Sequence, residues 1–379
     1  MRRFAGSGLV VLVCGAALAQ APTKFVEAKH KGGELKYVQG MPVLTVRGTP
    51  AEIGEQYGVL AVKNAPGPEA MLKQFLIDTK MEKRYGFLKF MANRLKPAFP
   101  ADHLTEIQAA AKASGKDLDM ALFANALYDL TTTFGCATVV VEKGRSETGQ
   151  PIFGRNFDWF PAKGIIDHTM LAVYHPAGKR AFATITTTPV TGCISGMNDA
   201  GLSVTLNQIN LNEAKTKPKM NWEGTPTMLA YRRVLEECGT VDEAEKLLNG
   251  MKRATTACMT ICDKDGGAVF EITPDQVERR TAVNDVCLCT NHLRTDPLTI
   301  GDKCLRYDRL QETQRSGRKL GVADVFADLD RVNQGRHTLQ AMVFEPSARR
   351  LHLKMGDRTE SATKFEAKTF DLGRLFDAK

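Results

Sequence analysis

The stretch FGCATVVVEKGRSETGQPIFGRNFDWF, residues 134–160, combines a lone cysteine, a turn and a returning charged segment. A β-branched run follows Cys136 and favours a strand, while the SETGQP segment near residue 148 favours a turn. Antiparallel pairing about that turn would bring Cys136 opposite residues 158–160, with Asp158 close to it and Arg155 one step inward. The spacing of Arg155 and Asp158 is odd, so an ideal strand directs them to opposite faces. We therefore expect a bulge or the strand's end to re-aim one of them.

This hairpin suggests nucleophilic chemistry at sulfur. A thiolate is the competent nucleophile, and the positive charge of Arg155 would lower the thiol pKa. No histidine lies nearby in sequence, but cutting the Gly135–Cys136 bond would free an α-amine on Cys136 itself. Such an amine has a pKa of about 7.7–8 and can take the thiol proton, while Asp158 would hold its ammonium form. Gly135 suits a self-cleavage site because glycine tolerates a strained backbone.

The same stretch resembles the N-terminal-nucleophile (Ntn) hydrolases of the choloylglycine hydrolase and acyl-CoA:6-aminopenicillanate acyltransferase group, to which acid ceramidase is related. In that group the nucleophile follows a self-cleavage site and opens a strand, and a Gly-Arg-Asn-x-Asp segment follows. Here that segment is GRNFD, residues 154–158. The tripeptide at the cut is Gly-Cys-Ala, whereas Gly-Cys-Thr is commoner in the group.

Three later segments match the group's motifs in the expected order. GMNDAGLSVTLNQ resembles a hairpin that places Asn207 as an oxyanion donor, and LCTNH resembles a strand end whose Asn291 supports the site. CLRYDRL resembles the segment that supplies a second arginine, here Arg306, with Arg309 as the alternative. Upstream, RGTPAEIGEQYG resembles the opening of the group's pro-region, so the resemblance covers residues 44–345.

The pattern of apolar residues changes abruptly at Cys136. Before it, apolar residues recur at three- and four-residue steps, which predicts helices. After it come nine short β-branched segments bounded by turns, with helices expected at about 225–250 and 303–331. These features predict an α+β fold with packed antiparallel sheets. The family resemblance implies, more specifically, a four-layer αββα sandwich.

The first nineteen residues have the features of a secretory signal peptide. Arg2 and Arg3 precede the apolar run Leu9–Val13, and Ala17–Ala19 ends the segment. The sequence thus predicts a signal peptide at 1–19, a helical pro-segment at 20–135 and a catalytic domain at 136–379, in an exported, periplasmic or secreted protein. From the helical pattern alone, residues 20–135 could also be a separate domain or a cap on the same core.

Charge and cysteine content limit the partners. The formal charge of +8 falls to +6 without Arg2 and Arg3, and no basic cluster alternates with aromatics, so nucleic-acid binding has no support. Weak attraction to anionic membrane surfaces is allowed, but stable membrane insertion is not expected. A small-molecule N-acyl substrate is the expected partner, and a homo-oligomer is compatible with the sequence.

The cysteines are expected to hold no metal. The even count after residue 19 suggests disulfides, but most lie in apolar runs, which favours buried free thiols. Their spacings suit zinc poorly, and no cofactor is expected. Eight cysteines follow the signal peptide: residues 136, 193, 238, 258, 262, 287, 289 and 304.

The sequence therefore predicts a self-processing N-terminal cysteine amidohydrolase or acyltransferase. It would act on the amide bond of an N-acyl substrate through an acyl-enzyme on Cys136, with the acyl group left open. One alternative is a papain-like hydrolase that pairs Cys136 with His292 or His337. Another is a lipid-binding family member that keeps the fold and never cleaves. Mutation of the histidines and an intact-mass measurement separate the three.

Overall fold

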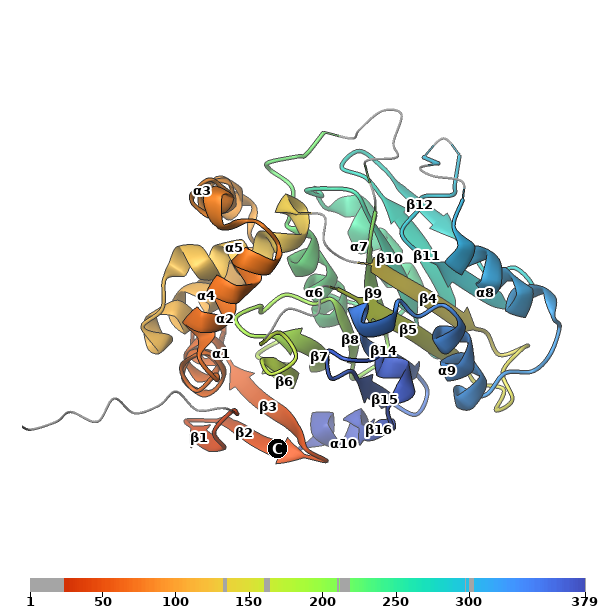
Figure 1. Cartoon of the computed structure of the whole chain (residues 1–379), viewed down its shortest axis with the longest axis horizontal. Coiled ribbons are helices and arrows are strands. Elements are labelled where there is room, and N and C mark those ends of the chain that lie inside the picture. Colours follow the sequence, from red (N-terminus) through yellow and green to blue (C-terminus); the bar gives the residue numbers. More distant parts are fainter. Residues whose placement is uncertain are drawn as a thin grey trace, which may run out of the picture.

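Two stacked β-sheets form the centre of the protein, and helices cover the outer face of each (Figure 1). None of the described helices combines the length and the apolar character needed to cross a bilayer. The predicted signal peptide lies outside the described residues. The computed structural model describes residues 24–131, 135–159, 164–209, 211, 219–296, 298–299 and 303–378.

The larger sheet has ten strands, in the order β1-β2-β3-β6-β7-β8-β9-β10-β11-β12. Its neighbouring strands are antiparallel except β3 and β6, which run parallel. Its strands are β1 (Ala28–His30), β2 (Gly33–Val38), β3 (Met41–Gly48), β6 (Thr169–Pro176), β7 (Phe182–Thr187), β8 (Ser195–Asn198), β9 (Ser203–Gln208), β10 (Ala257–Cys262), β11 (Gly267–Ile272) and β12 (Val277–Arg280).

The smaller sheet has six strands, all antiparallel to their neighbours, in the order β13-β4-β5-β14-β15-β16. This sheet lies between the larger sheet and a layer of helices, so both faces of β4 are buried and apolar. Its strands are β4 (Gly135–Val141), β5 (Ile152–Asp158), β13 (Val286–Cys289), β14 (Thr338–Glu345), β15 (Arg350–Met355) and β16 (Lys368–Asp371).

Helices α1–α7 pack on the larger sheet, and α8 and α9 pack on the smaller one. The helices expected near 225–250 and 303–331 are confirmed as α6, α7, α8 and α9. The helices are α1 (Pro50–Tyr57), α2 (Pro68–Asp78), α3 (Tyr85–Leu95), α4 (Ala101–Ser114), α5 (Leu118–Leu130), α6 (Thr227–Glu237), α7 (Val241–Gly250), α8 (Leu305–Arg315), α9 (Val322–Arg331) and α10 (Leu372–Asp377).

Three apolar cores separate these layers. Side chains alternate along β4, so that Val140 packs between the two sheets while Val139 and Val141 pack against α8 and α9. A third core lies between the larger sheet and helices α1–α7. The protein thus has the four-layer αββα architecture of Ntn hydrolases that the resemblance implied.

The β4–β5 hairpin forms as expected, but its register differs by one residue from the prediction. Cys136 lies opposite Phe157, and Gly135 lies opposite Asp158. Arg155 therefore shares the inner face of the smaller sheet with Cys136, while Asp158 points to the outer face. No bulge re-aims either residue in this pair. The irregularity lies instead in β14, whose register shifts between Thr338 and Gln340.

The segment before Gly135 is not purely helical, which corrects the prediction. It begins with β1, β2 and β3, which form one end of the larger sheet. A tight turn joins β2 to β3, with positive φ at Gln39 (51°) and Gly40 (72°). The run MPVLTVRG that follows is a strand-favouring pattern of apolar and β-branched residues, and the helical periodicity begins only at Pro50.

A buried ionic cluster joins α4 to α6. The Arg232 guanidinium, in α6, donates to Glu106 of α4 (Nη1–Oε1 2.7 Å) and to Glu236 of its own helix (Nε–Oε1 2.8 Å). Each of these three side chains is at most 2% exposed. The ammonium of Lys179 bonds Glu236 (2.7 Å) and Asp102. The carboxylates of Glu236 and Asp102 thus have a lysine as their cation.

Candidate active site

Cys136 lies near the start of β4, fully buried between the ends of the two sheets. Its Sγ accepts a hydrogen bond from Arg155 Nη2 at 3.1 Å and lies 3.3 Å from the carbonyl oxygen of Leu206, in β9. The other end of the Arg155 guanidinium donates to Ile194 O (2.8 Å) and Ser195 Oγ (2.6 Å). Arg155 is therefore fixed against both sheets, with one nitrogen directed at the sulfur.

The backbone of Cys136 is held by a side chain that follows β13, the neighbour of β4, and by one from α8. Its N–H donates to Asn291 Oδ1 at 3.0 Å, and its carbonyl accepts from Arg306 Nη1 at 2.6 Å. Arg306 Nη2 also donates to Asn291 Oδ1, at 2.7 Å. Of the two arginines considered from the sequence, Arg306 is the one in the site, because Arg309 bonds the exposed carbonyl of Arg331.

Asp158 belongs to the same cluster through Arg306. Its carboxylate accepts from Thr338 Oγ1 and Gln334 Nε2, both at 2.6 Å, and lies 3.5 Å from Arg306 Nη1. The acceptor of the Cys136 N–H is Asn291 rather than Asp158. The expected role of Asp158, which is to hold the ammonium that a cut at residue 135 would create, stays a prediction because the chain described is uncut.

Asn207 lies at the end of β9, opposite Cys258 in β10. Its Nδ2 donates to the carbonyl of Thr290 at 3.1 Å, which uses one of the two amide hydrogens. Its Oδ1 is buried and has no partner among the described residues. Among the described residues Nδ2 makes only the Thr290 bond, which leaves its second hydrogen for another acceptor.

Gly135 leaves room for the end of the Gln334 side chain beside Asp158. Its φ is not among the positive values, so the strained backbone expected at this glycine is not observed. A Cβ at this position would lie 2.5 Å from Gln334 Nε2 and 3.2 Å from the Cβ of Asp158. Any larger residue would therefore push Gln334 away from the Asp158 carboxylate.

Burial dominates the electrostatics of the uncut chain. It raises the pKa of the Cys136 thiol, although Arg155 opposes this effect. Burial also raises the pKa of Asp158, against the influence of Arg306. The expectation that Arg155 would set a low thiol pKa is thus outweighed by desolvation, and the thiol is neutral in the intact chain near pH 7.

The two histidines named in the papain-like alternative do not contact the Cys136 sulfur in the described part of the chain. The His292 ring faces Thr290 Oγ1 at 3.4 Å, and the carbonyl of His337 accepts from Trp159 N. His292 also lowers the pKa of Cys304, a thiol that the sequence did not single out. Burial opposes ionisation of Cys304, but His292 and Thr290 lower its pKa to about 6.

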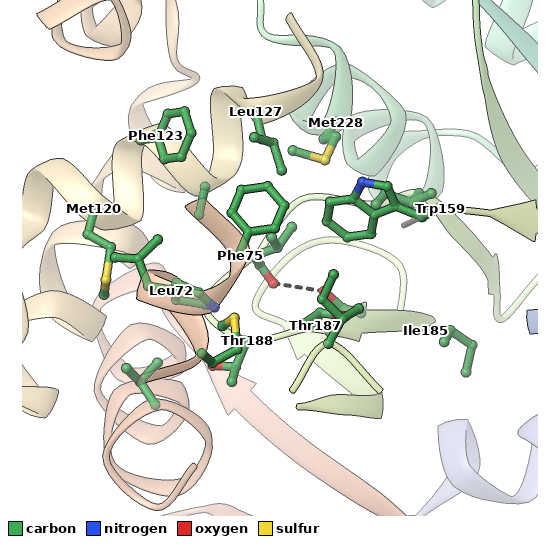
Figure 2. A pocket seen from close by; sticks show the side chains of 18 of the residues that line it. Leu72, Phe75, Met120, Phe123, Leu127, Trp159, Ile185, Thr187, Thr188 and Met228 are labelled. Carbon is green, nitrogen blue, oxygen red and sulfur yellow. Dashed lines mark hydrogen bonds between the residues drawn. The ribbon is translucent and has the colours of Figure 1, made fainter. Parts of the chain in front are cut away.

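An apolar pocket adjoins this cluster, and Figure 2 shows its wall. Phe157, which pairs with Cys136, and Ile194, whose carbonyl binds Arg155, both line it. It holds about 940 Å³ of empty space, part of it open to solvent. The remaining wall includes Leu72 and Phe75 from α2, Met120, Phe123 and Leu127 from α5, and Trp159, Ile185 and Met228.

None of the described cysteines forms a disulfide. All eight described cysteines are free and buried, in agreement with the prediction that they are buried thiols that pack as small apolar residues.

The structure brings together all six predicted catalytic positions. Cys136 contacts Arg155, Asn291 and Arg306 directly, while Asp158 and Asn207 join through Arg306 and the Thr290 carbonyl.

Comparison with solved structures finds proteins of low sequence identity. An N-acylethanolamine-hydrolyzing acid amidase ortholog from Caenorhabditis elegans is 18% identical, covering 62% of this chain and 99% of that one (TM-score 0.45). Penicillin V acylase from Agrobacterium tumefaciens is 16% identical, covering 64% and 88% (TM-score 0.49). A variant of conjugated bile acid hydrolase from Clostridium perfringens is 13% identical, covering 64% and 95% (TM-score 0.47).

Comparison with curated protein sequences finds no match, whereas comparison with family models does. The model of the acyl-coenzyme A:6-aminopenicillanic acid acyl-transferase family matches residues 145–360, which include Arg155, Asp158, Asn207, Asn291 and Arg306. The matched region covers more than half of the 379 residues, so the chain belongs to the acyl-coenzyme A:6-aminopenicillanic acid acyl-transferase family.

Proposed function

We propose that this family member is a self-processing N-terminal cysteine amidohydrolase or acyltransferase that acts on N-acyl substrates through Cys136. The observation that carries the proposal is the separate restraint of three Cys136 atoms. Arg155 holds the sulfur, Asn291 the nitrogen and Arg306 the carbonyl oxygen. A buried structural cysteine needs no such set of two charged side chains and an amide.

Self-cleavage would begin with attack of the Cys136 sulfur on the carbonyl carbon of Gly135. The Gly135–Cys136 C–N bond breaks, the Cys136 nitrogen takes the thiol proton, and the Gly135 acyl group becomes a thioester on sulfur. Water then hydrolyses the thioester and releases the Gly135 carboxylate. Asn291 Oδ1, which already accepts from the Cys136 N–H, would hold the new amine in place.

Turnover would use the same sulfur and the new amine. The amine takes the thiol proton, the sulfur attacks the substrate carbonyl, and the resulting ammonium returns the proton to the departing amine. The second amide hydrogen of Asn207 would stabilise the oxyanion, a contribution of about 3–4 kcal/mol for one donor. Water, or another amine, then removes the acyl group from Cys136. Hydrolysis is the favoured outcome.

Intact-mass analysis of the purified protein tests self-cleavage. We expect two chains, the second with the mass of residues 136–379, which is 244 residues. With the leader removed near Gln20, the first chain would have the mass of residues 20–135, or 116 residues. Export, and the division of the chain at residue 135, are parts of this proposal. A single chain that never acquires an acyl adduct at Cys136 would favour the lipid-binding alternative.

The apolar pocket predicts an apolar acyl group. Ala124 of α5 lines the pocket and is small, so Ala124→Phe should fill part of it. We expect this variant to lower kcat/KM for long-acyl amides by about tenfold or more, since apolar pocket contacts contribute roughly 1–3 kcal/mol.

Acetyl amides of the same amines serve as the control for the Ala124→Phe series, because their acyl group does not reach the pocket wall. Their kcat/KM should change little. Equal losses on long and short acyl groups would show that the pocket does not bind the acyl chain.

A further inference from the structure

Helices α2 and α3 carry large apolar side chains on the outside of the molecule. Phe87 and Phe90 of α3 are 61% and 64% exposed, and Ile77 of α2 is 40% exposed. The opposite side of α3 is buried through Leu88 and Leu95, so the phenylalanines form its outward stripe. Figure 1 shows α3 at the outer edge of the helical layer, beyond α5.

Basic side chains surround these apolar ones. Residues 71–97 contain seven lysines or arginines against two acidic residues, a net charge of +5 out of +8 for the whole chain. One surface depression is lined by three basic residues, one acidic residue and two others: Lys80, Lys83, Arg84, Glu82, Ile77 and Thr79. We call this surface the basic aromatic face; it consists of Lys73, Ile77, Lys80, Lys83, Arg84, Phe87 and Phe90.

We propose that the basic aromatic face docks on the surface of an anionic lipid bilayer. Exposed aromatic side chains insert at the level of the headgroups and upper acyl chains, and lysines and arginines around them bind lipid phosphates. Charge complementarity selects this partner, because the positive charge of the chain is concentrated on this segment. An apolar surface that met only a neutral partner would need no such excess of basic residues.

Docking would place α2 between the lipid and the apolar pocket. The outer side of α2 carries Ile77, and its inner side supplies Leu72 and Phe75 to the pocket wall (Figure 2). The proposal concerns binding alone and does not depend on cleavage at Cys136. It can therefore be tested on the whole protein without an assay of activity.

Co-sedimentation with vesicles tests the proposal. We expect the full-length protein to bind vesicles of phosphatidylcholine mixed with phosphatidylglycerol, to bind pure phosphatidylcholine vesicles much less, and to dissociate as salt is raised. Two double variants should each weaken binding by about tenfold or more. The first is Phe87→Ser with Phe90→Ser, and the second is Lys83→Glu with Arg84→Glu.

Matched controls use exposed residues of the same chemistry elsewhere. Val283→Ser changes another exposed apolar residue (59% exposed), and the pair Lys246→Glu and Lys264→Glu reverses two other exposed charges. Both controls should bind vesicles as the wild type does. Thermal unfolding of every variant checks that the fold is retained, and the charge pair tests the face even if the phenylalanine pair fails to fold.

Three results would overturn the proposal. The first is a wild-type protein that does not bind the phosphatidylglycerol vesicles. The second is an equal loss of binding in the control variants. The third is a wild-type dimer in solution that the Phe87→Ser and Phe90→Ser pair dissociates without changing vesicle binding, since this would identify the face as a self-association surface.

Discussion

Replacing Cys136 by alanine is expected to abolish both cleavage of the Gly135–Cys136 bond and turnover of amide substrates. The variant loses the only atom that attacks a carbonyl in both steps, so activity should fall by on the order of 10⁶-fold. The purified variant should have the mass of one uncut chain. Because alanine fits the space of the buried thiol, the fold and the Asn291 and Arg306 contacts to the backbone should persist.

Cys262→Ala is the matched control, since Cys262 is equally buried and lies in β10, outside the cluster around Cys136. This variant should still split into two chains. His292→Ala should also split and stay active, because in the proposed mechanism the Cys136 nitrogen takes the thiol proton during cleavage and the freed amine is the base in turnover. Cleavage at residue 135 in the Cys136→Ala protein would refute the mechanism, and loss of activity in His292→Ala with Cys136 intact would favour the papain-like alternative.

The second large effect is expected on stability. Arg232→Met leaves the buried carboxylates of Glu106 and Glu236 without their common cation. In the intact protein Arg232, with His103 and Lys179, outweighs burial and holds the pKa of Glu236 low. Breaking a buried pair by removing one partner costs about 3–5 kcal/mol, so the free energy of unfolding should fall by that amount. Denaturant unfolding of the uncut Cys136→Ala chain measures it.

Arg233→Met provides a close comparison in the same helix. Arg233 also pairs with a glutamate four residues on, Glu237, at 2.7 Å, but both side chains are partly exposed (27% and 32%). Exposed pairs contribute about 0–1 kcal/mol, so this variant should lose less than about 1 kcal/mol. If the two substitutions lower the free energy of unfolding equally, burial of the α4–α6 cluster does not explain its contribution to stability.

The sequence contains most of the information about the β4–β5 hairpin. The β-branched run after Cys136 and the turn near residue 148 predict β4 and β5, and all nine strands expected after residue 135 are present. The register was wrong by one residue because turn length alone does not fix pairing. That single step decides which face each side chain takes, and it places Asp158 on the face opposite the Cys136 side chain.

Other features could not be predicted from local patterns. The strands β8, β12, β15 and β16 are not predicted because they are short or polar, and of these β12 and β16 are edge strands. The pocket is built from α2, α5 and the end of β5, which are distant in sequence. The contacts of Arg306 and Asn291 with Cys136 were reached only through family resemblance, because no spacing rule links residues more than 150 positions apart.

The parallel pairing of β3 with β6 has a consequence for the fate of the upstream chain. Six consecutive residue pairs, from Val43 with Leu171 to Gly48 with Pro176, join these strands. If the residues before the cut diffused away, β6 would become an exposed edge strand, and its unpaired peptide groups could bond to strands of other molecules. If the proposed cut occurs, loss of the N-terminal piece would therefore favour aggregation, and we expect that piece to stay bound as a lasting subunit.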